Sequence, residues 1–488
     1  MDVKLNSDAD GDSTPPRLTN LQKFGMLSRF MLPLVITNMV PDAAEQVLTR
    51  GITSIASDEM TTLLASYGLA YYVTKILISV ANEQRHVGIV LVKTWQDQVR
   101  MTIFSIVNGI FLSSLLFIIG LSPLGILLIR DLHGQSEEVA TITCRIITYL
   151  SPIPFLEAIA YYFEGGLIGH KFTGYAGIAK ITDFAMQTVF TVALLFTSTR
   201  TEPVLVPVFS LYAGIIGRFV IVIGFWVILV RRLLPDRKPT EKSLTVASTI
   251  WFLIPLVMVR VVQVTSRPII NLVVSRTLSE TAGPKAAAQV TVYPAGRVVF
   301  SWLNDLRTIP PTFHKVTPQH EKFKIKTLSI YATFCTMSAF TINFLLYIIP
   351  GAAYFVMNTL IGLNSELAEL SVLPLRIFSI VCLCIGPRAY LTGILIMKKK
   401  TMYLTPSALF RFLGLILFLS TLSNTRLSGA NLGITSLLLG FVLEAIFVVA
   451  AVTFLRYKPK LCSRTKHSVE DDSTATEAMP LSNTKSQP

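Results

Sequence analysis

The chain has 488 residues, of which 52% are hydrophobic and 15% charged, and its mean hydropathy is +0.58. Soluble domains carry about 25% charged residues, so this composition excludes an ordinary soluble protein. The net charge of +14 is spread over many short segments, which argues against a nucleic-acid-binding groove. The N-terminus is polar and acidic and has no apolar stretch, so no cleaved signal peptide is expected.

Long apolar runs follow one another along the chain, and many reach the roughly 20 residues needed to cross the hydrocarbon of a bilayer. They predict an all-α integral membrane protein with twelve transmembrane helices, at residues 25–55, 61–81, 101–128, 138–163, 172–196, 204–230, 244–277, 286–309, 328–357, 367–397, 404–422 and 432–455. Six spans in each half predict two lobes, 25–232 and 244–456, joined by a cytoplasmic loop at 233–243. The ends at 1–24 and 457–488 are expected to be disordered and cytoplasmic.

Lysine and arginine are concentrated in alternate connections between the spans. Arg85 belongs to one such connection, and Lys398 begins a run of three lysines in another. Basic loops remain on the cytoplasmic side of membranes, so this pattern predicts that both ends of the chain are cytoplasmic. Near the cytoplasmic end of the eighth span, Asp305 and Arg307 are expected to form a salt bridge within the helix end.

An internal repeat relates the two halves of the sequence. Residues 33–54 and 255–276 both begin Pro-Leu-Val and carry polar residues at the same places, 222 positions apart. A second match joins the Gly-Leu-Ile segment at 166–168 to the Gly-Ile-Leu segment at 393–395, 227 positions apart. Two matches at nearly one offset predict two related halves of the same orientation, arranged about an axis along the membrane normal.

Both repeats carry a polar face. Residues spaced by three or four positions share one side of a helix, which predicts polar stripes of Asn38, Asp42 and Glu45 in the first span and of Arg260, Gln263, Arg267 and Asn271 in the seventh. An arginine near the bilayer centre costs about 2.5–3.5 kcal/mol, so these faces must meet protein or water. Further candidates for the same cavity are Lys75, Glu157, Glu164, Arg276, Arg297, Arg376 and Arg388.

Two interpretations of these charges stay open. An acidic residue of the first stripe could pair with an arginine of the second and simply fix how the halves dock. Alternatively, the basic residues bind an anion and the acidic ones couple protons or gate the path. Basic residues outnumber acidic ones in the spans of the second half, which favours a small polyanion as substrate.

Motifs for enzymatic chemistry are not found in the sequence. It contains no GxxxxGK[ST], HExxH or GxSxG motif, and its six histidines have no metal-binding spacing. We therefore expect neither an enzyme nor a bound metal or cofactor. A channel is disfavoured because no filter-forming motif is present.

Six segments resemble the progressive ankylosis protein family, in order and spacing, from about Leu27 to Leu455: PLVITNMVPDAAEQVLTRGI, LASYGLAYYVTK, SRPIINLVVSRTL, YPAGRVVFSWLNDLR, VLPLRIFS and RAYLTGIL. The resemblance implies a multispan protein of the plasma membrane, with a possible endomembrane pool. It implies export of pyrophosphate, ATP or citrate-like anions, with effects on mineralisation. This family resembles in turn the multidrug and polysaccharide exporters, whose twelve helices form two lobes around a central cavity.

The resemblance also implies particular site residues and partners. It adds Arg50 to Asp42, Glu45, Glu157 and Glu164 as candidates for coupling or gating. The expected partners are a small anion and anionic lipids at the basic loops and tail, with no nucleic acid, and the protein is expected to be monomeric. The alternatives are a flippase for a phosphorylated lipid and a membrane regulator that stimulates anion or ATP release by another channel.

Overall fold

The computed structural model describes residues 19–53, 60–132, 136–196, 204–236, 244–277, 292–293, 295–314, 323–360, 365–423 and 429–474. Within these residues every regular element is a helix. The first half contains α1 (Asn20–Thr53), α2 (Met60–Asn82), α3 (Gln84–Val90), α4 (Trp95–Leu121), α5 (Pro123–Ile126), η1 (Leu127–Leu132), α6 (Glu137–Leu150), α7 (Ile153–Gly169), α8 (Thr173–Leu195), α9 (Leu205–Phe225), η3 (Trp226–Val230) and η4 (Arg231–Leu233).

The second half begins with the longer helix α10. It contains α10 (Val246–Thr277), η6 (Ser301–Thr308), α12 (Ile309–Phe313), α13 (Ile325–Asn343), η7 (Phe344–Ile348), α14 (Ala352–Phe355), η8 (Val356–Leu360), α15 (Ser365–Ser379), α16 (Val381–Met397), η9 (Thr401–Leu404), α17 (Thr405–Leu422) and α18 (Ala430–Thr474). The α18 helix thus continues into the tail that the sequence predicted to be disordered from residue 457. That stretch is helical as far as Thr474, and the disorder of the tail stays a prediction.

Several helices are long and apolar enough to cross a membrane. Among the described residues there are eight, and nine if the bent pair α6 and α7, with an angle of 43°, forms one span. On α4, the side chains of Ile103, Val107, Ile110 and Phe111 are more than half exposed, a surface that suits lipid rather than water. The protein is therefore an all-helical, multi-pass membrane protein. Twelve spans and the cytoplasmic position of both ends stay predictions.

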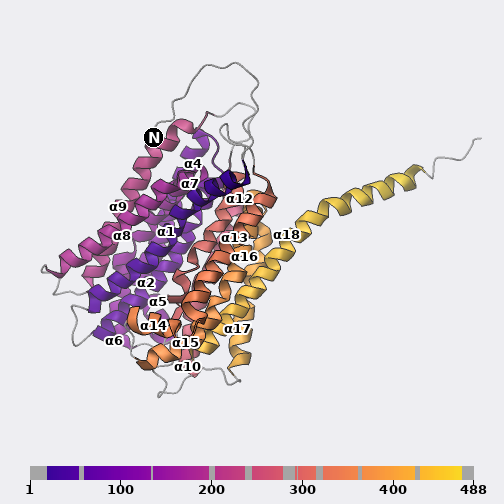
Figure 1. Cartoon of the computed structure of the whole chain (residues 1–488). Coiled ribbons are helices and arrows are strands. Elements are labelled where there is room, and N and C mark those ends of the chain that lie inside the picture. Colours follow the sequence, from indigo (N-terminus) through magenta and orange to yellow (C-terminus); the bar gives the residue numbers. More distant parts are fainter. Residues whose placement is uncertain are drawn as a thin grey trace, which may run out of the picture.

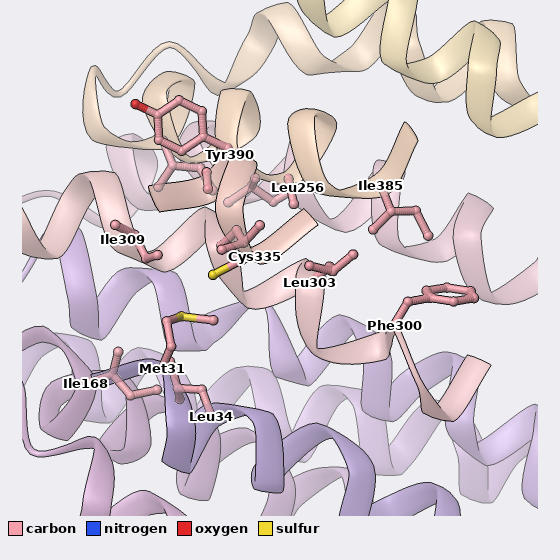
Figure 2. Packing of buried hydrophobic residues seen from close by; sticks show 14 of the residues in the cluster. Met31, Leu34, Ile168, Leu256, Phe300, Leu303, Ile309, Cys335, Ile385 and Tyr390 are labelled. Atoms are coloured by element: carbon pink, nitrogen blue, oxygen red, sulfur yellow. The ribbon is translucent and has the colours of Figure 1, made fainter. Parts of the chain in front are cut away.

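One apolar core is shared by the two halves. Figure 1 shows the first-half helices, coloured indigo to magenta, beside the second-half helices in orange and yellow. In Figure 2, Met31 and Ile168 of the first half lie near Leu303 and Ile309 of the second, and all four belong to one buried cluster. The first-half members come mainly from α3, the early turns of α1, α4 and α8 and the late turns of α7 and α9. This places the apolar contact between the halves at the end of the bundle that contains α3, η6 and α12, which we call the closed end.

The predicted repeat has a structural counterpart in two turns at this end. Lys171 and Lys399 are the non-glycine residues with positive φ in the described chain, at 68° and 54°. Lys171 donates its backbone N–H to the carbonyl of Ile168 at 2.9 Å. Lys399 donates to the carbonyl of Ile396 at 3.0 Å. The two turns therefore share one backbone geometry at an offset of 228 residues, one more than the sequence match indicated, and the repeat of the whole halves stays a prediction.

Candidate functional site

A cavity lies between the halves. Helices α1, α2, α3, α7 and α8 line it from the first half, and α10, η6 and α15 to α18 from the second. Six side chains that the sequence predicted for such a cavity line it: Asn38, Lys75, Arg260, Gln263, Arg297 and Arg388. Helical periodicity thus identified residues that the fold brings together.

The charged side chains of this cavity have one sign. Among the described residues, those that line it are Lys75, Arg85, Lys180, Arg260, Arg297, Arg388 and Arg411, and no carboxylate is among them. Charges of one sign between walls of low dielectric concentrate the field, so these side chains favour anions, although carboxylates behind the wall pair with several of them.

Several of these cations also form cation–π contacts with aromatic rings. The ring of Tyr161 has Arg218 at 4.3 Å, Lys180 at 5.3 Å and Arg85 at 5.7 Å. The ring of Phe441 has the guanidinium of Arg411 at 4.1 Å. Cations at these distances are attracted by the negative face of a ring. The rings therefore fix the orientation of the cations without reducing their charge.

In the first half, carboxylates lie behind the cavity wall. Arg218 is fully buried and binds Glu157 at 2.5 Å and Glu164 at 3.1 Å. Arg85 binds the other oxygen of Glu164 at 2.5 Å. Glu157 and Glu164, predicted to couple or gate, thus do not line the cavity but hold arginines. Both oxygens of Glu164 are used in ion pairs, as a buried carboxylate requires.

The second half contains a buried ion cluster in which one carboxylate pairs with two arginines, the reverse of the first-half cluster. One oxygen of Glu444 on α18 accepts hydrogen bonds from Arg388 at 2.8 Å and from Arg411 at 2.7 Å. The other oxygen accepts a bond from Gln263 at 3.2 Å. The sequence reasoning missed Arg411 and Glu444, although single charges inside the apolar runs 404–422 and 432–455 are a signal that could have identified them.

Two reciprocal ion pairs join the halves at the closed end. Arg307 of η6 lies 3.2 Å from Glu83, which links α2 to α3. Arg85 of α3 lies 3.2 Å from Asp305 of η6, and Asn38 of α1 also donates to Asp305. The predicted salt bridge between Asp305 and Arg307 within one helix end is therefore wrong, since each residue pairs across the halves.

The burial of Arg85 also corrects a prediction. The sequence placed it in a basic loop, but its side chain is 5% exposed because α3 follows α2 almost directly and packs on α7. A Cβ on Gly165 would lie 2.1 Å from the carbonyl oxygen of Arg85, and one on Gly393 2.5 Å from that of Arg307. Glycine at these two equivalent positions therefore lets α3 and η6 lie against α7 and α16.

A sequence signal for these ion pairs exists and was missed. Residues 82–85 read Asn-Glu-Gln-Arg and residues 304–307 read Asn-Asp-Leu-Arg, 222 positions apart, the offset that also relates Pro33 to Pro255. In each segment the acidic residue and the arginine are two positions apart. Related halves that meet face to face can therefore exchange these charges reciprocally.

Arg260 is held more loosely than the other cavity arginines whose contacts are known. Arg85, Arg388 and Arg411 each have a carboxylate oxygen within 3.2 Å. Arg260 reaches Glu83 at 4.0 Å, and its side chain is 21% exposed. Its Nε has no hydrogen-bond partner among the described residues. The guanidinium of Arg260 is thus the most loosely paired of these four, although the Nε of Arg85 also has no hydrogen-bond partner among the described residues.

One further predicted residue is described and does not line the cavity. Arg376 lies on α15 and is not among the residues that line the cavity. The other side chains lie outside the described residues: Asp42, Glu45, Arg50, Arg267, Asn271 and Arg276. In the described part of the chain, no group of three or more His, Cys, Asp or Glu side chains could hold a metal ion.

The arrangement of helices matches that of known transporters. A MOP superfamily transporter of Pyrococcus furiosus, described by a reverse polarity of its binding pocket, aligns with a TM-score of 0.65 at 14% identity, covering 89% of this chain and 96% of the other. The eukaryotic MATE transporter AtDTX14 aligns at 0.67 and 13% identity, covering 89% and 96%. A mutant of the Vibrio cholerae MATE transporter VcmN aligns at 0.68 and 12% identity, covering 89% and 97%. The chain therefore has the fold of MATE-like membrane transporters.

The family is shown by the sequence itself. Residues 17–360, well over half of the chain, match the family described as Progressive ankylosis protein (ANKH). The protein belongs to this family, as the six segments in the sequence indicated.

Proposed function

We propose that this protein is a secondary transporter that exports small polyanions across the plasma membrane by alternating access. The substrates we propose are pyrophosphate, ATP or citrate-like carboxylates, and their export would affect mineralisation. The observation that carries the proposal is the cavity between the halves, whose described charged side chains are all basic. The family and the transporter fold agree with it.

The chemistry of the lining favours anions with phosphate or carboxylate groups. Arginine presents a planar fork that donates two parallel hydrogen bonds to such groups. Of the cavity residues, Arg260 is the best candidate for a first contact because its contact with Glu83 is long and its guanidinium is partly exposed. A cation would meet no carboxylate among the described residues that line the cavity, and a neutral solute would not form ion pairs with its arginines.

Alternating access requires contacts between the halves that can open. At the closed end these contacts include the two reciprocal ion pairs and the rings of Phe30 and Phe313, whose centroids are 5.0 Å apart. Separation that hydrates both partners of a buried ion pair has a modest net cost, because the recovered solvation offsets much of the lost attraction. Separation here and closure at the opposite end would expose the cavity alternately to each side.

The test is efflux from liposomes that contain the purified protein, with labelled pyrophosphate, ATP and citrate. Arg260→Ala should reduce efflux of the transported anion at least tenfold. The matched control is Arg130→Ala, an exposed arginine on η1 that pairs with Asp131 away from the cavity. Lack of efflux of all three anions by folded wild-type protein, or equal efflux by Arg260→Ala and wild type, would overturn the proposal.

A lipid flippase is the second candidate, and one observation favours it. A second pocket lies between α4 and α10, lined by lipid-facing side chains such as Ile254 and Met258. The amide of Gln84 in this pocket is 1% exposed and has no partner among the described residues. Movement of a fluorescent phospholipid between leaflets, without efflux of the free anions, would favour this function.

A further inference from the structure

We infer that Glu83 couples anion binding in the cavity to the ion pairs that join the halves at the closed end. Glu83 can do so because it contacts Arg260, which also lines the cavity. This inference rests on the proposed function. Glu83 is a positioning residue: it does not line the cavity and acts through the arginine that does.

Glu83 is a buried carboxylate of the first half that is neutralised by the second half. Its exposed fraction is 0%. Arg307 lies 3.2 Å from both of its oxygens, and Arg260 lies 4.0 Å from one of them. The remaining group that faces it is His86 of its own half, at 3.7 Å. The ionised form of Glu83 therefore depends on two arginines that move with the other half.

Arg260 can interact both with an anion in the cavity and with Glu83 behind the cavity wall. Its guanidinium lines the cavity, whereas Glu83 lies behind the wall. An anion that enters the cavity and binds Arg260 draws this charge away from Glu83. Conversely, Glu83 reduces the positive potential that the anion meets. The carboxylate and the substrate thus compete for one cation, and linkage makes the effect reciprocal: the substrate weakens the hold of the second half on Glu83.

The second ion pair between the halves, Arg85 with Asp305, also includes an arginine that lines the cavity, but Arg85 is held more tightly than Arg260. Asp305 is held by Arg85 and Asn38, and neither Arg85 nor Asp305 contacts Arg260. Arg85 is in addition held by Glu164 at 2.5 Å. The two ion pairs come from related sequence segments and have the same nitrogen–oxygen distance. Of the two, the pair that contains Glu83 also contacts the loosely held Arg260 of the cavity. The chain therefore contains its own matched control.

The experiment measures equilibrium binding of labelled pyrophosphate, citrate and ATP to the purified full-length protein, and transport of the bound anion in liposomes. Glu83→Gln removes the competing charge, so the anion should bind about tenfold more tightly while turnover falls at least fivefold. Arg307→Gln leaves Glu83 to Arg260 alone, so the anion should bind about fivefold more weakly. Asp305→Asn breaks the other ion pair and should change the Kd less than twofold.

Coupling predicts that Glu83→Gln and Arg307→Gln shift the Kd in opposite directions, which distinguishes it from a purely structural role. Glu83→Gln and Arg307→Gln break the same ion pair, so a structural effect would shift the Kd of both variants in the same direction. That result, or equal responses of Glu83→Gln and Asp305→Asn, would overturn the coupling while wild-type binding and transport left the proposed function intact. A wild-type protein that binds none of the three anions would overturn both. Arg307→Gln keeps the inference testable if Glu83→Gln does not fold.

Discussion

Arg218 and Glu444 are the centres of two buried ion clusters of opposite sign, one in each half. Arg218 on α9 binds two glutamates of α7, and Glu444 on α18 binds one arginine of α16 and one of α17. The first cluster has an excess of negative charge, which Arg85 offsets, and the second has an excess of positive charge. The repeat thus preserves the position of a charged centre near the cavity while the sign of its charge is reversed.

The Glu444 cluster should be essential for stability. Glu444→Gln leaves Arg388 and Arg411 buried without a carboxylate, and breaking a buried ion pair from one side costs about 3–5 kcal/mol. Thermal unfolding in detergent should show a clearly lower Tm. The double variant Glu444→Gln/Arg411→Gln removes one of the unpaired charges and should recover part of the loss. A single variant as stable as wild type would contradict this role.

Opening of the closed end should be necessary for transport. Phe30 and Phe313 approach within 5.0 Å from opposite halves, so cysteines at both positions should be joined by a short cross-linker that a reductant cleaves. Cross-linking should stop efflux, because the halves can no longer separate, and the reductant should restore it. The two single-cysteine variants are the controls. Full efflux from completely cross-linked protein would rule out separation at this contact.

The left-handed residues in the two equivalent turns should accept glycine. Lys399 has φ of 54°, and an L-residue in this region is strained by roughly 1 kcal/mol. Lys399→Gly should therefore stabilise the protein by about 0.5–1 kcal/mol. Lys171→Gly should gain less, since Lys171 also lies 5.1 Å from the ring of Phe313. The neighbouring Lys398, with φ of −79°, is the control, and its change to glycine should lower the Tm.

The close contact of η6 with α16 should not tolerate a methyl group. In Gly393→Ala the new Cβ would lie 2.5 Å from the carbonyl oxygen of Arg307, so backbone must move, at a cost of about 1–3 kcal/mol. Gly224→Ala on α9 is the comparison, because nothing lies within 4 Å of its Cβ. That variant should be stabilised by about 0.5–1 kcal/mol. Equal Tm values for the two variants would show that η6 does not need this close approach.

Much of the cavity could be predicted from the sequence because helical periodicity and apolar run length are local properties. The spacing of Asn38 in the first span, and of Arg260 and Gln263 in the seventh, places them on polar faces of apolar helices, and such faces must turn away from lipid. The match of Pro33 with Pro255 indicated two related halves before their contact was known.

The sequence by itself indicated the family, the all-helical membrane class, and basic residues such as Arg260 on a polar face of an apolar helix. The tertiary structure alone decided which charges remain accessible. Glu164 lies behind the wall rather than in the cavity, and Arg85 is buried rather than in a loop. Glu83 forms an ion pair with Arg307, which lies 224 positions further along the chain. Pairing of this kind depends on how distant helices pack. The related segments 82–85 and 304–307 therefore indicate these partners only once the two halves are known to face one another there.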